Sequence, residues 1–194
     1  RNFTTSFSND SIWMFMRRNG YHTASVSPFA GRHSAWWFNA GFVETFDTCK
    51  GGMESAEEIT PIALDWLERN GEKDNWLLHV NFWDPHTPYR APEEFGNPFK
   101  DDPLPPWMNE KTIRKHCSMP GGHSAMELNM YDDGEKPDYP RHPGKVSNMK
   151  EFRKMIDGYD CGIRHMDNHI GKIFSKLKEL SIMDETAVII TSDH

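Results

Sequence analysis

The sequence has few cysteines, and those it has are far apart. Cys49, Cys117 and Cys161 are the three cysteines among 194 residues, and no CxxC pair occurs. An odd and scattered set predicts neither a disulfide framework nor a cysteine-rich zinc site. It leaves the compartment open, with a reducing, cytoplasmic one favoured over a secreted or periplasmic one.

Basic residues and long apolar runs are also scarce. There are 22 Lys and Arg against 29 Asp and Glu, a formal net charge of −7, and no long basic run, so we expect no nucleic-acid partner. No apolar stretch approaches the roughly 20 residues that span a bilayer. The chain opens with Arg1 and shows no signal-peptide pattern, so any targeting signal is expected outside these residues. Nothing in the composition indicates the oligomeric state.

What is present is an alternation of strand and helix patterns. Three short runs, rich in apolar or β-branched residues, are typical of buried strands: 22–27, 76–82 and 186–191. Helix signals lie before and between them: a cap at Asn9 or Asp10 before the first run, and a capping box at 55–58, with an alternative start at Thr60-Pro61, between the first two. Residues 39–54 are expected to form a loop or β-hairpin. This order predicts an α/β fold with a mainly parallel sheet covered by helices on both faces.

Residues 148–180 carry the longest periodic pattern. Apolar residues recur there at steps of three and four for about nine turns, after a cap at Asn148. Gly158, Gly162 and Gly171 would each cost about 1 kcal/mol in a helix interior, which suggests close backbone packing or a break near Gly158. The Asp and His residues of this helix fall mostly off its apolar face and are expected to be solvated.

The stretch WDPHTPY at 83–89 follows the second strand directly. Its two prolines end the strand and place four polar side chains just beyond it: Asp84, His86, Thr87 and Tyr89. Ligands of open α/β sheets bind outside the carboxyl ends of strands, so these residues are candidates for a site. The alternative is a proline-rich surface turn with an incidental histidine.

The run LLHVNFWDPHTPY at 77–89 resembles the central segment of the sulfatases, in the alkaline-phosphatase-like superfamily. NGYHTA at 19–24 and TSDH at 191–194 are also similar to sulfatase segments. The resemblance implies an alkaline-phosphatase/sulfatase-like α/β fold, incomplete in this segment. Residues 1–194 would then be the middle part of a single catalytic domain, with a substrate-side insertion at about 96–147.

The same resemblance implies roles for individual residues. His86 would be the catalytic histidine that contacts the sulfate ester, and Asp84, Thr87 and Tyr89 would bind the substrate. Asp193 and His194 would bind a divalent metal at the end of the third strand, and a carboxylate beside an imidazole suits such an ion. Calcium is usual in sulfatases, while manganese or zinc stays open.

One segment departs from the family pattern. Residues 27–31 read SPFAG, where common sulfatases have a turn whose lysine and histidine touch the sulfate. Arg32 and His33 follow at once and are the candidates to bind the anion in their place, the arginine through a bidentate contact. The alternative is a solvated turn before the aromatic residues at 36–38.

The resemblance implies a sulfuric ester hydrolase that acts with a metal on a small anion, with a sulfated sugar as the expected substrate. No cysteine or serine of the chain stands in the C/S-x-P/A-x-R motif that yields the formylglycine nucleophile. We therefore expect no hydrolytic turnover from this segment alone. Two alternatives are a phosphodiesterase or phosphonate monoester hydrolase of the same superfamily, and a non-catalytic anion-binding module.

Overall fold

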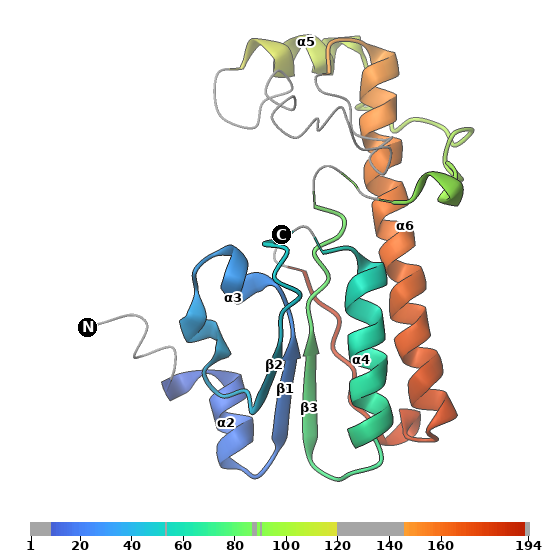
Figure 1. The fold of residues 1–194 in the computed structure, drawn as a ribbon. Coiled ribbons are helices and arrows are strands. Elements are labelled where there is room, and N and C mark those ends of the chain that lie inside the picture. The colour runs from blue at the N-terminus through green and yellow to red at the C-terminus, as the bar shows by residue number, and fades with distance from the viewer. Residues whose placement is uncertain (1–8, 53, 87–88, 90, 120–145, 193–194) are drawn as a thin grey trace. The chain divides into compact units, whose positions relative to one another are not determined.

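The computed structural model describes residues 9–52, 54–86, 89, 91–119 and 146–192 (Figure 1). The chain divides into two compact units. Unit 1 comprises Arg1–Trp83 and Asn168–His194, and unit 2 comprises Asp84–Asp167. Among the described residues, no helix has both the length and the apolar character needed to cross a membrane.

Unit 1 contains a three-stranded parallel sheet in the order β2-β1-β3. Its strands are β1 (His22–Val26), β2 (Glu44–Phe46) and β3 (Trp76–Val80), and β1 pairs in parallel with both others. The parallel sheet with its helices confirms the predicted α/β class. The hairpin considered for 39–54 is wrong, because α3 (Phe29–Arg32) and η1 (Trp36–Asn39) return the chain so that β2 runs parallel to β1.

Helices and aromatic residues cover both faces of this sheet (Figure 1). Ala24 of β1 packs in a cluster with Trp66 and Leu67 of α4 (Ala56–Asn70) and Leu177 of α6 (Met149–Glu179). The opposite face presents His79, whose ring contacts three aromatic rings: Trp13 of α2 (Ile12–Arg18), Phe38 and Phe42. Alternate residues of each strand therefore face different helices, as the period of two in a strand requires.

The third predicted strand does not form. Residues 186–192 have no regular structure, and Val188, Ile189 and Ile190 are exposed, although their β-branched pattern is typical of a buried strand. A β-branched pattern shows only that the side chains suit a sheet. To form a strand, the backbone also needs a neighbouring strand with which it can form hydrogen bonds. β3, predicted to be buried, is half-buried along its whole length.

The helix boundaries follow the capping signals closely. In α4, the Ser55 amide donates to the Glu58 carboxylate at 3.1 Å, as the predicted capping box requires. In α6, the Glu151 amide donates to Asn148 Oδ1 at 3.0 Å, which confirms that cap. The first helix differs, because its cap is Ser11, whose hydroxyl accepts from the Met14 amide, and neither Asn9 nor Asp10.

α6 is one continuous helix of 31 residues, without a break at Gly158. The long helix is confirmed, but the expectation that its polar residues are solvated is wrong for three of them. Asp157, His165 and His169 are only 4–6% exposed. A helix packed on more than one side buries residues off its main apolar stripe, which a single-stripe pattern does not reveal.

The described residues of unit 2 form two elements besides the first part of α6. These are η2 (Glu93–Phe95), just before the substrate-side insertion predicted at about 96–147, and α5 (Glu110–Ser118), within it. The Asn109 side chain caps α5 by accepting from the Lys111 and Thr112 amides, each at 3.1 Å. Ile113 of α5 is buried with Val146 and Phe152. Part of the predicted insertion is therefore helical, at 110–118.

Candidate active site

β1 and β3 end side by side at one edge of the sheet. The Asn81 amide donates to the Val26 carbonyl at 2.9 Å, and the Ser27 hydroxyl donates to Asn81 Oδ1 at 3.1 Å. These bonds tie the two segments together one residue beyond the strands. The carboxyl edge of a parallel sheet is where α/β proteins place their ligands, so the residues that follow Ser27 and Asn81 form the candidate active site.

After β1, the chain turns directly into α3. The Phe29 amide donates to the Ser27 hydroxyl at 3.2 Å, and Arg32 is the last residue of the helix. The ring of His33 lies 4.8 Å from that of Phe29 and 5.7 Å from that of Trp83. Both Arg32 and His33 are exposed. They therefore present a cation and an imidazole beside the segment that leaves β3.

The loop at 47–54 supports the Arg32 side chain. A Cβ added at Gly52 would lie 2.8 Å from Cδ of Arg32, so the aliphatic part of the arginine rests against the backbone there. The carboxylate of Glu54 holds this loop by accepting from the Thr48 hydroxyl at 2.9 Å and from the Lys50 and Gly52 amides at 2.8 Å each. Glu54 is fully buried. Its carboxylate thus fixes the surface against which Arg32 packs.

Unit 2 begins with the other predicted site residues. Asp84 is 4% exposed, His86 is exposed and Tyr89 is half-buried. The Tyr89 amide donates to the His86 carbonyl at 3.1 Å, which closes a tight turn. A Cβ added at Gly162 of α6 would lie 2.9 Å from Cβ of Pro85, so this turn starts in close contact with the helix.

Tyr89 carries a phenol whose pKa is raised above its usual value. Burial raises the pKa of Tyr89, and the nearby Tyr159 raises it further. The two rings are 5.5 Å apart and nearly perpendicular, at 74°. The phenol therefore keeps its proton at neutral pH.

The structure describes five of the eight residues predicted for the site. Arg32 and His33 lie together in unit 1, and Asp84, His86 and Tyr89 lie within six residues of one another in unit 2. Thr87, Asp193 and His194 are outside the described residues. The metal pair predicted at the end of the chain thus stays a prediction.

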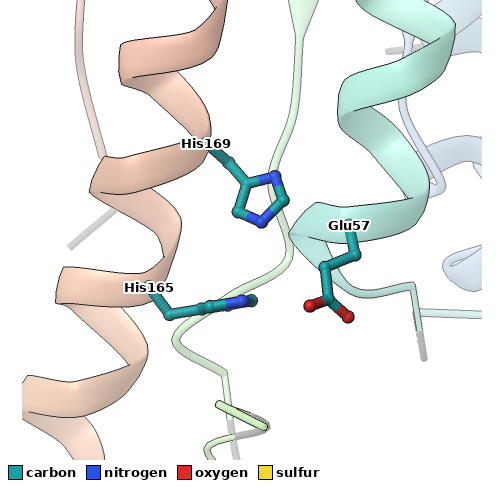
Figure 2. Close-up of side chains that lie close together, drawn as sticks. All are labelled: Glu57, His165 and His169. Carbon is teal, nitrogen blue, oxygen red and sulfur yellow. The ribbon is translucent and has the colours of Figure 1, made fainter. Parts of the chain in front are cut away.

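A second group of ligand-type side chains was missed by the sequence pattern. Glu57 of α4 and His165 and His169 of α6 each offer one ligand atom, and these atoms lie within 4.8 Å of one another. Figure 2 shows both imidazoles projecting from α6 toward the carboxylate. The spacing of four residues between the histidines was the available signal, since it places both on one face of a helix.

The sequence matches the family model described as Sulfatase over residues 6–194. The chain belongs to the sulfatase family. The match covers all of the described residues, so it includes the edge of the sheet and the residues from Asp84 to Tyr89. This sulfatase chain therefore carries the family's α/β fold, in agreement with the resemblance drawn from the motifs.

Several curated proteins are similar to this sulfatase chain. Iduronate 2-sulfatase of Homo sapiens is 22% identical, with 95% of this chain and 40% of the relative aligned. Choline-sulfatase of Rhizobium meliloti (strain 1021) is 24% identical, with 84% of this chain and 31% of the relative aligned. The multifunctional alkaline phosphatase superfamily protein PehA of Trinickia caryophylli is 26% identical, with 70% of this chain and 26% of the relative aligned. The chain thus spans about two fifths or less of these relatives, and no solved structure matches it significantly.

Proposed function

We propose that the protein is a sulfuric ester hydrolase that uses a metal and acts on a small sulfated carbohydrate. The family match and the relatives named as sulfatases support the reaction class. The observation that supports the placement of the site is the His33–Trp83 contact, with the rings 5.7 Å apart. It joins the segment after β1 to the segment after β3 at the carboxyl edge of the sheet.

In this proposal, Arg32 and His33 bind the sulfate group. Arginine offers a planar fork of N–H donors that matches two oxygens of a tetrahedral anion. The exposed guanidinium can meet an anion from solvent, while its stem is held against Gly52. His33, whose ring is tilted against those of Phe29 and Trp83, adds a hydrogen-bond donor.

His86 is the proposed proton donor to the departing alcohol. A histidine suits this role because its usual pKa lies near neutrality. It is exposed in the turn that Pro85 and Tyr89 define, so an ester can reach the imidazole. Tyr89 and Thr87 are proposed to contact the substrate, and buried Asp84 to fix the start of the turn.

Asp193 and His194 are proposed as metal ligands. A carboxylate oxygen and an imidazole nitrogen fit a divalent ion by their donor chemistry, with calcium the first choice and manganese or zinc the alternatives. Such an ion, when bound, would polarise the sulfate oxygens. Residues 1–194 contain no C/S-x-P/A-x-R motif. We therefore also propose that these residues alone do not catalyse hydrolysis of the ester.

The substrate class is tested with the full-length protein. Hydrolysis of 4-nitrophenyl sulfate, 4-nitrophenyl phosphate and bis(4-nitrophenyl) phosphate is compared, followed by sulfate release from sulfated monosaccharides. We expect kcat/KM to be highest for a sulfate ester. A preference for either phosphate ester would instead favour the second candidate, a phosphoester hydrolase.

That second candidate has two observations in its favour. α3 replaces the lysine- and histidine-bearing turn of common sulfatases, and one similar protein is named as a multifunctional alkaline phosphatase superfamily member. A phosphate ester can use the same arginine and histidine donors. Absence of turnover on all three esters would favour a module that binds anions without hydrolysing them.

A further inference from the structure

The loop at 47–52 follows β2 and begins at the edge of the sheet that carries the candidate active site. Its start is tied to the end of β1, because the Ser27 amide donates to the Phe46 carbonyl at 3.0 Å. The three strands are parallel, so the segments that follow them leave the sheet at one edge. The loop is therefore a third segment at this edge, beside the segments that carry Arg32 and Trp83.

Two contacts place this loop against α3. A Cβ added at Gly31 would lie 2.6 Å from Oδ2 of Asp47, and one added at Gly52 would lie 2.8 Å from Cδ of Arg32. Gly31 and Arg32 are consecutive, so the loop meets the helix at the end that carries the guanidinium. Lys50 is two residues from Gly52, and two residues span at most about 7 Å of backbone. A second cation is therefore anchored near the proposed sulfate ligand.

The backbone of Lys50 is fixed within this loop. Its amide donates to Glu54 Oε1 at 2.8 Å, and Glu54 is fully buried. The residues on either side, Cys49 and Gly51, have positive φ angles of 62° and 65°. A positive φ is uncommon in a residue other than glycine, and strained residues of this kind gather at ligand-binding sites. The lysine is thus presented from one defined backbone position.

The ammonium of Lys50 pairs with a carboxylate oxygen of Glu58, in the first turn of α4. The Lys50 side chain is still 53% exposed, so solutes can reach it. The other oxygen of Glu58 accepts from the Ser55 amide at 3.1 Å in the capping box. An exposed ion pair is weak and is screened by salt, so an anion from solution can replace Glu58 as the partner of the ammonium.

We propose that Lys50 binds a second anionic group of the substrate, a carboxylate or a further sulfate, beside the sulfate ester bound by Arg32. The inference rests on the proposed function for the position of that ester. It narrows the substrate class to sulfated carbohydrates with at least two negative charges. Lysine suits this role because its ammonium is a point charge that an anion can approach from several directions.

Binding is measured by calorimetry on the full-length protein with two compounds that cannot be hydrolysed as sulfate esters. In 4-carboxyphenylmethanesulfonate, a sulfonate replaces the sulfate ester and a carboxylate supplies the second anion. In 4-carbamoylphenylmethanesulfonate, an uncharged amide of similar shape replaces the carboxylate. We expect the natural protein to bind the carboxylate compound severalfold more tightly, which is the effect of an exposed ion pair. Lys50→Met should abolish this preference and leave Kd for the amide compound unchanged.

Glu58→Gln tests whether the carboxylate of Glu58 competes with the substrate anion. Glutamine can keep the capping box but not the ion pair with Lys50. The variant should therefore bind the carboxylate compound more tightly, with Kd for the amide compound unchanged. Lys73→Met is the matched control, because it removes an exposed lysine that precedes β3, at the opposite edge of the sheet. It should retain the preference of the natural protein.

Three results would overturn the proposal: no binding of either compound, equal Kd values for the two in the natural protein, or the same preference in Lys50→Met. Hydrolysis of 4-nitrophenyl sulfate is measured separately, so failure of the proposed reaction is distinguishable. A preference that depends on Lys50, without turnover of that ester, would reject the reaction and support the second anion site. Turnover without such a preference would do the reverse.

Discussion

Gly162 of α6 lies directly against Pro85, and a Cβ on the glycine would come within 2.9 Å of Cβ of the proline. Pro85 immediately precedes His86, the proposed proton donor. The absence of a side chain on the helix therefore sets the position of the turn that carries the histidine. This contact explains one of the three glycines in the long helix, whose cost of about 1 kcal/mol would otherwise favour alanine.

Gly162→Ala should reduce kcat in the full-length protein by about tenfold or more, because displacing a catalytic group by a fraction of an ångström is costly. Its net effect on the free energy of unfolding should be small, since the better helix propensity of alanine offsets the collision in part. Turnover and chemical denaturation measure the two effects separately.

Gly171→Ala is the matched control in the same helix. No atom outside its own turns of helix lies within 4 Å of the position that its Cβ would take, and the residue is exposed. It should raise the free energy of unfolding by up to about 1 kcal/mol with kcat unchanged. Equal kcat values for the two variants would contradict a positioning role for Gly162.

Gly52 and Gly51 provide a test variant and its matched control for the position of Arg32. Both have positive φ, +87° and +65°, so alanine at either should cost about 1–2 kcal/mol of stability. Only at Gly52 would the new Cβ collide with the Arg32 side chain, at 2.8 Å from Cδ. Gly52→Ala should therefore raise KM for the sulfate ester severalfold more than Gly51→Ala. The same KM in both variants would place Arg32 outside the substrate site.

His79 should make stability depend on pH. Burial lowers the pKa of His79 from 6.5 to about 4 in the folded protein. Between these values the unfolded chain binds a proton that the folded one does not, so stability is complete above about pH 6.5 and falls toward pH 4. The free energy of unfolding should drop by about 2 kcal/mol from pH 7 to pH 5 through this residue.

His79→Gln is the control for this titration, since glutamine does not ionise and can still bond to Ser25, whose hydroxyl lies 3.0 Å from Nδ1. Urea denaturation at both pH values gives the comparison. The variant should lose about 2 kcal/mol less than the natural protein between pH 7 and pH 5. Identical losses would show that the imidazole titrates normally in the folded state.

Local signals in the sequence predicted most of the fold. The capping box at Ser55 and Glu58 and the cap at Asn148 predicted where α4 and α6 begin. Both strands that lead into the site were predicted within a few residues. These features depend on neighbouring residues in the chain, which a sequence shows directly.

Features that depend on distant partners were missed. α5 has only Ile113 and Cys117 as an apolar face, and its packing partners Val146 and Phe152 are far along the chain. The run at 186–191 has strand-forming residues but no paired edge in the described structure. The sequence predicts solvated side chains for His165 and His169, because their burial depends on what packs beside α6.

The candidate active site likewise has features that local sequence patterns predict and features that depend on distant residues. The sequence predicted that residues after two strands would meet, and the paired ends of β1 and β3 account for this. It gave no indication that Glu54 organises the loop under Arg32, since that role comes from three hydrogen bonds to its carboxylate. A lone glutamate in a glycine-rich stretch has no pattern that distinguishes it from a solvated one.

The most direct test is the effect of His86→Ala on hydrolysis of a sulfate ester by the full-length protein. His116→Ala, at an exposed histidine of α5, serves as the control, and circular dichroism confirms that both variants fold. The proposed role predicts that kcat falls by about two to four orders of magnitude in His86→Ala and is unchanged in His116→Ala. An unchanged kcat in a folded His86→Ala protein would contradict the assignment of His86 as the proton donor.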